Sequence, residues 1–195
     1  LFLRVGHIER FNSAFRAVKK MAKRIKFIEI HRLGPFTPRV KDCGVVLDLM
    51  IHDIDIVLSL IPSSLAFLDG VGVNVLTKHE DIANVRLKFE NGAIVNLTAS
   101  RLTPEKKRKI RIFQDDACIS IDYQNQDAVI YRKELFRISE KKIDIEKEEP
   151  LKAELSAFIH AVRKDESHDR IDFDARNALD LALRILDSIH DNHKQ

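Results

Sequence analysis

The stretch VRLKFENGAIVNLTAS, residues 85–100, decides the fold of this chain. In its first half apolar residues alternate with charged or polar ones, which is the period-two pattern of a strand with one buried face. Asn91 and Gly92 then form the dipeptide most typical of a tight hairpin turn, and alternation resumes after it. The stretch therefore predicts an antiparallel hairpin.

Three later segments extend this alternation, so we expect a sheet of roughly six or more mostly antiparallel strands over residues 64–145. These segments are residues 109–123, 127–133 and 135–145. Helical periodicity returns in residues 148–164 and 173–190, the second helix with Asp172 or Asp174 as its N-cap. The predicted fold class is α+β, an open sheet with its helices on one face.

The segments ahead of the hairpin differ from this pattern. Residues 2–8 are predicted to be a short buried strand, followed by a helix over 14–24 with Asn12 or Ser13 as its cap. Residues 25–33 follow as a second strand, and the Pro- and Gly-containing segment after them is predicted to be a loop. This order indicates a fragment of βα structure in front of the main sheet.

The composition is that of a globular protein without an obvious charged partner. The chain has 195 residues, 45% of them hydrophobic, a mean hydropathy of -0.20 and a formal charge of +3. This charge is too small to argue for nucleic acid or membrane partners, and we expect neither. The two cysteines give no disulfide framework and no metal-ligand spacing, which fits a cytoplasmic protein.

Residues 44–61, GVVLDLMIHDIDIVLSLI, are predicted to form a buried helix that carries ionisable side chains near its centre. On a helical wheel one stripe holds Asp48, His52 and Asp55 and has no Lys, Arg, Glu or Gln, which is typical of a cleft. Asp48 lies four residues before His52, so we expect its carboxylate to orient the ring as a general acid/base needs. Asp53 faces the apolar half and requires a polar partner there.

Other interpretations of this helix stay open. The Asp and His four residues apart can form an ordinary structural hydrogen bond. The dipeptide His52 and Asp53 also occurs in metal-dependent phosphohydrolases, but those resemble all-helical bundles, and the alternating strands argue against them. A metal site that uses His31 or His79 is not supported by the spacing, so we predict no metal.

Three segments together resemble landmarks of the GFO/IDH/MocA family of nicotinamide-dependent sugar oxidoreductases. They are VGHIERFNSAFRAVKK (5–20), RLGPFTPR (32–39) and DCGVVLDLMIHDIDIVLSLI (42–61). The resemblance is strongest to the branch of UDP-N-acetylglucosamine 3-dehydrogenases and runs from residue 4 to the end of the chain. In it, the family's Asp-x-x-x-His signature corresponds to Asp48 and His52.

The resemblance also implies that part of the enzyme is missing. Family members begin with a Rossmann domain that carries a Gly-rich fingerprint and a Glu-Lys-Pro motif, and this sequence contains neither. Residues 1–11 resemble the last strand of that dinucleotide-binding domain. Residues 12–195 resemble the C-terminal substrate-binding and oligomerisation domain, which is similar to that of dihydrodipicolinate reductase. The resemblance thus implies a truncated enzyme that is inactive alone.

The implied chemistry is oxidation of a ring hydroxyl of a sugar or nucleotide sugar to a ketone, with NAD or NADP as cofactor. His52 would be the acid/base and Asp48 would hold its ring or a substrate hydroxyl. The resemblance also implies that Arg10, Asn12 and Asp55 lie near the substrate. Arg32 and Arg39 are candidates to bind the pyrophosphate of a nucleotide sugar.

Two surfaces have their own expectations. The basic run EKKRKIR, residues 105–111, has no interleaved aromatic residues, so we interpret it as a solvated sheet edge. The polar sheet face around Arg86 and Lys88 corresponds to a subunit contact in the family, which implies a homodimer or homotetramer. The alternative is a non-catalytic, sheet-mediated oligomerisation or sugar-binding module.

Overall fold

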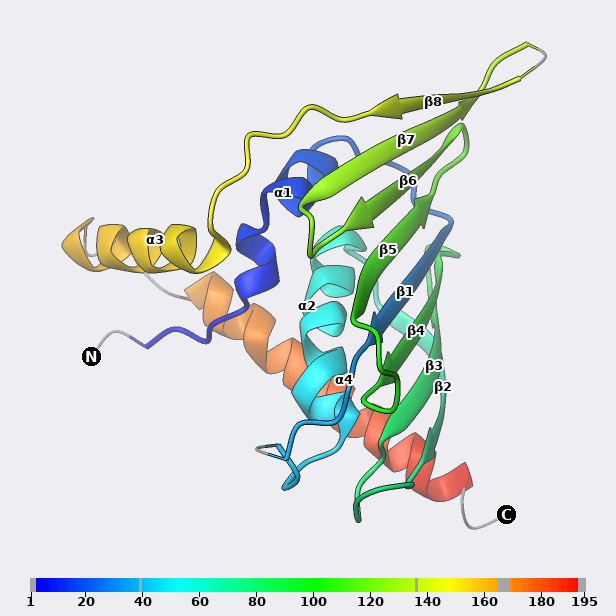
Figure 1. Cartoon of the computed structure of the whole chain (residues 1–195), viewed down its shortest axis with the longest axis vertical. Coiled ribbons are helices and arrows are strands. Elements are labelled where there is room, and N and C mark those ends of the chain that lie inside the picture. The colour runs from blue at the N-terminus through cyan, green and yellow to red at the C-terminus, as the bar shows by residue number, and fades with distance from the viewer. Residues whose placement is uncertain (1–2, 39, 136, 165–168, 193–195) are drawn as a thin grey trace.

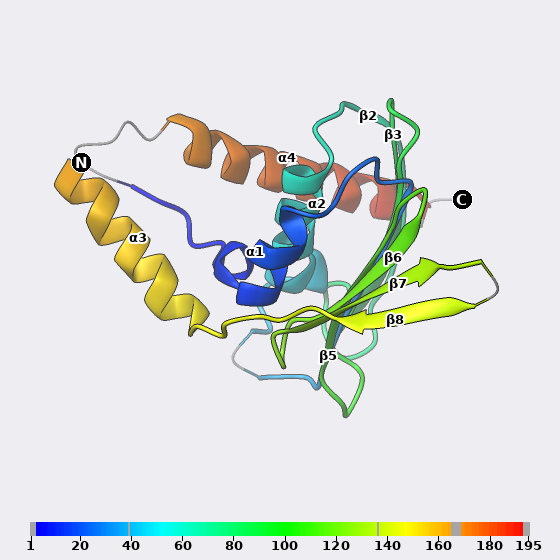
Figure 2. The same ribbon diagram turned by 90° about the horizontal axis from the view of Figure 1, so that it is seen from above.

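The computed structural model describes residues 3–38, 40–135, 137–164 and 169–192, with the backbone alone over 169–173. Within these ranges the chain forms one eight-stranded open sheet in the order β2-β3-β4-β1-β5-β6-β7-β8. Figures 1 and 2 show that the helices lie on one side of this sheet and leave its other face open. The predicted fold class is therefore confirmed.

The predicted hairpin is the pair of strands β3 (Ile82–Phe89) and β4 (Ile94–Ser100), which are antiparallel. Gly92 sits in the turn with φ of 84°, a conformation that glycine adopts without the steric cost that a side chain brings. The turn closes through the Gly92 N–H, which donates to the Phe89 carbonyl at 2.9 Å. The Asn-Gly signal thus fixes the register of the two strands.

The remaining strands continue on both sides of this hairpin. They are β1 (Phe27–Leu33), β2 (Leu65–Val73), β5 (Lys107–Phe113), β6 (Ala117–Asp122), β7 (Asp127–Lys133) and β8 (Ile138–Lys142). Among the described pairings, only β1 with β4 is parallel. The sheet is mixed because β1 enters at its centre and is followed by a crossover helix instead of a hairpin.

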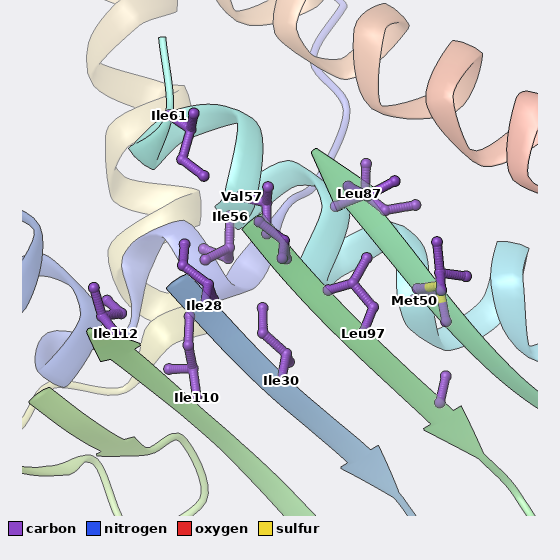
Figure 3. Packing of buried hydrophobic residues seen from close by; sticks show 14 of the residues in the cluster. Ile28, Ile30, Met50, Ile56, Val57, Ile61, Leu87, Leu97, Ile110 and Ile112 are labelled. Atoms are coloured by element: carbon purple, nitrogen blue, oxygen red, sulfur yellow. The ribbon is translucent and has the colours of Figure 1, made fainter. Parts of the chain in front are cut away.

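The crossover helix α2 (Ile51–Leu60) packs its apolar side against the middle of the sheet. Figure 3 shows Ile56, Val57 and Ile61 facing the isoleucines of β1 and β5, and Ile56 and Val57 are completely buried. Burial of each such side chain contributes about 1.5–3 kcal/mol relative to exposure in water. This contact holds the helix that carries His52 against the sheet.

The first segment of the chain differs from its prediction. Residues 3–7 form no strand, and Ile8–Phe11 forms a 3₁₀ turn (η1) that leads into α1 (Ser13–Lys19). The strand prediction over 2–8 is wrong because a strand needs a neighbour to pair its backbone groups, and this segment instead buries polar side chains beside α2 and α3. Helix α1 also ends five residues earlier than predicted.

The two C-terminal helices are α3 (Pro150–Lys164) and α4 (Asp169–Asn192). Asp172 and Asp174 lie inside α4, so the cap prediction is wrong; the Asp174 carboxylate accepts a hydrogen bond from Arg10 at 3.1 Å instead. Helix α3 begins close to its predicted start, but its apolar face is open: Leu155 is 53% exposed and Ile159 is 50% exposed.

The basic run is not at a sheet edge. Its strand, β5, lies between β1 and β6 and pairs with both in antiparallel register. The prediction of an edge is wrong because side chains that point away from the sheet stay charged and solvated even on a central strand.

Candidate functional site

The helix that carries His52 begins with a π-helical turn, Val46–Met50 (η2), which leads directly into α2. The absence of a side chain at Gly44 permits this start, because a Cβ there would lie 1.9 Å from the Glu80 carboxylate. That carboxylate accepts a hydrogen bond from the Val46 N–H at 3.1 Å. Glu80 therefore pins the beginning of the helix to the segment ahead of β3.

The π-turn separates Asp48 from His52. A π-turn contains one residue more than an α-helical turn, so residues four apart no longer lie directly above one another. The side chain of Asp48 makes no hydrogen bond to His52, and the Nδ1 atom of His52 is buried without a hydrogen-bond partner among the described residues. The predicted orientation of the ring by Asp48 is therefore absent from this structure.

His52 faces a second histidine that the sequence analysis missed. The rings of His7 and His52 lie edge to face, with 6.2 Å between their centroids. His7 is only 6% exposed, and neither of its ring nitrogens has a hydrogen-bond partner among the described residues. Three buried imidazole nitrogens of two neighbouring rings thus have no protein partner among the described residues, and each could bond to a polar ligand.

Both rings are held in the neutral form. Burial lowers the pKa of His52, and the positive charge of Arg32 lowers it further. Burial also lowers the pKa of His7, although the Asp55 carboxylate opposes this shift. Near neutral pH each ring therefore has a nitrogen lone pair that can accept a proton.

A buried ion network lies beneath His52. Arg32 donates two hydrogen bonds of 2.8 Å to the two carboxylate oxygens of Asp53, and a third of 3.0 Å to Glu9. The expectation that Asp53 finds a polar partner near the apolar half is confirmed. These bonds use three of the five N–H donors of the Arg32 guanidinium, and its predicted contact with a pyrophosphate stays a prediction.

A second network holds the turn η1 against α2. Arg10 donates to both carboxylate oxygens of Asp55, and to Asp174 on α4. The Nε2 atom of His7 lies 3.8 Å from Asp55. Asp55 is 1% exposed and holds Arg10 beside His7, and its predicted contact with a substrate stays a prediction.

Asn12 is a helix cap. Its side-chain oxygen accepts the N–H of Ala14 at 3.1 Å, and its amide donates to the carbonyl of Tyr123 at 3.0 Å. The cap prediction is confirmed; Asn12 is 2% exposed, and its predicted substrate contact stays a prediction. Arg39 lies outside the described residues.

Asp48 lines a cavity of about 320 Å³. The walls come from the segment after β1, the end of β4 and the start of β5. Its lining includes the side chains of Arg32, Arg101, Lys106 and Arg108. The volume lies within the range of small-molecule sites.

The metal alternatives find no support in the described part of the chain. No three His, Cys, Asp or Glu side chains converge there in a way that would hold a metal ion. His31 alternates with the buried Arg32 on β1 and so points to the opposite sheet face, while His79 is on an exposed loop. The eight-stranded sheet also excludes an all-helical phosphohydrolase fold.

His7 and Glu9 are the functional candidates that the sequence analysis overlooked. His7 belongs to the segment 2–8 that is predicted to be a buried strand, and Glu9 follows directly after it. The available signal was a histidine in a supposedly buried strand, with a glutamate two residues later that would share its face if the strand continued. None of the described helices is both long enough and apolar enough to cross a membrane.

Several known proteins are similar to this chain in sequence and in architecture. Residues 4–120 match the GFO/IDH/MocA C-terminal domain. The chain is 33% identical over 169 residues to a UDP-N-acetylglucosamine 3-dehydrogenase of Acidithiobacillus ferrooxidans, covering 83% of this chain and 54% of that protein. The solved structure of that organism's UDP-N-acetylglucosamine 3-dehydrogenase GnnA has a TM-score of 0.89 at 32% identity, covering 97% of this chain and 62% of that one.

A levoglucosan dehydrogenase in complex with NADH and L-sorbose has the same fold at 14% identity. Its TM-score is 0.77, and the match covers 95% of this chain and 62% of that one. The chain thus spans between about half and two thirds of the length of these relatives. The family match over residues 4–120 and the identity to the Acidithiobacillus enzyme show that this chain belongs to the GFO/IDH/MocA family, to whose C-terminal domain it corresponds.

Proposed function

We propose that this chain is the C-terminal substrate domain of an NAD(P)-dependent dehydrogenase that oxidises a ring hydroxyl of a sugar or nucleotide sugar to a ketone. UDP-N-acetylglucosamine, oxidised at its 3-hydroxyl, is the first substrate to test, because the curated relative with 33% identity is named for that reaction. The observation that carries the proposal is the pairing of the half-buried His52 with the buried His7, whose rings both have buried nitrogens without a hydrogen-bond partner.

His52 is the proposed proton acceptor. Oxidation of an alcohol to a ketone removes a hydride from carbon and a proton from oxygen, and a bound nicotinamide would accept the hydride. The neutral ring of His52, whose pKa burial and Arg32 lower, has a free lone pair for the proton. The proposed role of His7, whose ring centroid lies 6.2 Å from that of His52, is to hydrogen-bond to the same ligand.

The other predicted residues take different roles in this proposal. Asp48 no longer orients His52, but it lines the adjacent cavity and can accept hydrogen bonds from sugar hydroxyls. Arg10 and Asp55 hold the turn that carries His7, and Asn12 caps the helix that follows it. In this proposal Arg10, Asp55 and Asn12 position the segment that carries His7.

The exposed apolar surfaces favour partners that cover them. The face of α3 that includes Leu155 and Ile159 is proposed to dock against a dinucleotide-binding domain, which would carry the residues for NAD or NADP. On the open face of the sheet, Phe67 and Val71 of β2 are each 52% exposed. That exposure favours a homodimer or homotetramer through the sheet, and also the alternative of a non-catalytic assembly or sugar-binding module.

A chimera tests the proposal. The N-terminal part of the Acidithiobacillus ferrooxidans enzyme, up to the start of the aligned region, is fused ahead of Leu1, with the intact Acidithiobacillus enzyme as positive control. Formation of NADH or NADPH is followed with UDP-N-acetylglucosamine and with a panel of free and nucleotide-linked sugars. Turnover of any of these sugars supports the proposal. A chimera that binds the cofactor but oxidises none of them would favour the non-catalytic module.

A further inference from the structure

The cavity beside Asp48 has an uneven distribution of charge. Four cationic side chains and one carboxylate line it. Two of the cations are already neutralised: Arg32 by Asp53 and Glu9, and Arg101 by Asp81 at 2.6 Å. The cationic residues of the lining that make no short ion pair among the described residues are therefore Lys106 and Arg108.

Lys106 and Arg108 have no close carboxylate partner among the described residues. No ion pair involves Lys106, and the nearest carboxylate to Arg108 is Glu9 at 3.9 Å, whose same oxygen already accepts from Arg32. Arg108 lies opposite Arg32 in the pairing of β5 with β1, so like charges meet across the two strands. The Glu9 carboxylate lies between these two arginines, but it makes no hydrogen bond to Arg108, whose N–H donors remain available to an anion in the cavity.

The segment that carries these cations is fixed in place. The Gly34 N–H donates to the Ser100 carbonyl at 3.0 Å, and the Thr103 N–H donates to the Gly34 carbonyl at 3.2 Å. Arg101 also donates to the carbonyls of Val40 and Cys43 in the opposite wall. The two walls are therefore joined by hydrogen bonds, and little ordering remains to be done when a ligand binds.

We propose that Lys106 and Arg108 form a phosphate subsite in this cavity, which takes the diphosphate of a nucleotide-linked sugar; this inference rests on the proposed function and narrows its substrate class. One cavity then offers a carboxylate for sugar hydroxyls, at Asp48, and two cations for phosphate oxygens. A free sugar has no group that uses the cations. The subsite replaces the pyrophosphate role predicted for Arg32, whose guanidinium is already paired.

The subsite is tested first by binding, which needs no turnover. Titration calorimetry measures the affinity of the 195-residue chain and of the chimera for UDP and for inorganic pyrophosphate. Lys106→Ala and Arg108→Ala should each weaken the binding of both probes about tenfold. The matched control is Lys107→Ala, which removes the same charge from an exposed neighbour that does not line the cavity, and it should leave affinity unchanged.

The outcomes separate this inference from the proposed function. The subsite is supported if Lys106→Ala and Arg108→Ala bind UDP more weakly while Lys107→Ala binds UDP as tightly as the unmutated protein. This holds even if the chimera oxidises no sugar. Where the chimera is active, the variants should raise KM for the nucleotide-linked substrate about tenfold and leave kcat unchanged. Equal losses in Lys106→Ala and Lys107→Ala, or no binding of either probe to the chain or the chimera, would overturn the inference.

Discussion

Replacement of Arg32 by Met tests whether the ion network beneath His52 holds the site together. Arg32 is 4% exposed and donates three hydrogen bonds, of 2.8, 2.8 and 3.0 Å, to the buried carboxylates of Asp53 and Glu9. Although burial lowers the pKa of Arg32, the charge and hydrogen bonds of Asp53 raise it above its ordinary value, so the network is ionised. Met has a similar length and removes only the charge and the donors.

The expected loss is large because the substitution leaves two buried carboxylates without a counter-charge. Breaking a buried ion pair from one side costs about 3–5 kcal/mol. For a chain of this length each kcal/mol lowers Tm by about 2–4 °C, so Arg32→Met should lower Tm by roughly 6–20 °C in a thermal melt. Substituting Gln for Glu9 and Asn for Asp53 in the same variant should recover part of this loss.

The control is Arg111→Met on the neighbouring strand. The Arg111 side chain is 60% exposed and lies 3.6 Å from Glu29, so its ion pair should contribute no more than about 1 kcal/mol. Calorimetry or circular dichroism of both variants gives the comparison. A fall in Tm for Arg32→Met no larger than that for Arg111→Met would refute the role of the buried network.

Two further predictions concern pH. Although burial raises the pKa of Asp81, hydrogen bonds from the backbone N–H groups of Val75 and Leu76, together with the bond from Arg101, lower it well below the ordinary value of 3.8. The stabilisation by the Asp81 carboxylate is therefore present above pH 3.8 and is lost as the pH falls towards the lower pKa of the folded state. The difference in unfolding free energy between the wild type and Asp81→Asn, measured by urea denaturation, should become smaller from pH 7 to pH 3. Burial and the charge of Arg32 lower the pKa of His52, so in an active chimera kcat/KM should begin to fall only below pH 6.5. A fall in kcat/KM centred above pH 6.5 would contradict the assignment of His52 as the proton acceptor.

The sheet could be predicted from sequence because its signals are local. Alternation and the Asn-Gly turn at residues 91–92 set strand positions and register over neighbouring residues, and the structure confirms both. The parallel pairing of β1 with β4 could not be predicted in the same way, because it joins segments that are far apart in the chain. The ends of α1 and α4 were also missed, since tertiary contacts outweigh capping preferences there.

The site could be predicted less well. The importance of His52 and the need of Asp53 for a partner came from their place on an apolar helix, and the buried partner of Asp53 is confirmed as Arg32. The assumption of regular helical spacing failed at the π-turn, where Asp48 lines a cavity and makes no hydrogen bond to His52. The pairing of His7 with His52 depends on how the first segment packs against α2, and no periodic pattern encodes that contact.

The most direct test of the central claim is the turnover of the chimera after His52→Asn. The substitution keeps a polar side chain of similar size but removes the group that accepts the proton. We predict a fall in kcat of about 100-fold or more, with Tm within about 2 °C of the unmutated chimera. The control, His79→Asn on the exposed loop, should retain full activity. A His52→Asn variant that keeps kcat, or that loses kcat only in proportion to folded protein, would contradict the assignment of His52 as the acid/base of a sugar dehydrogenase.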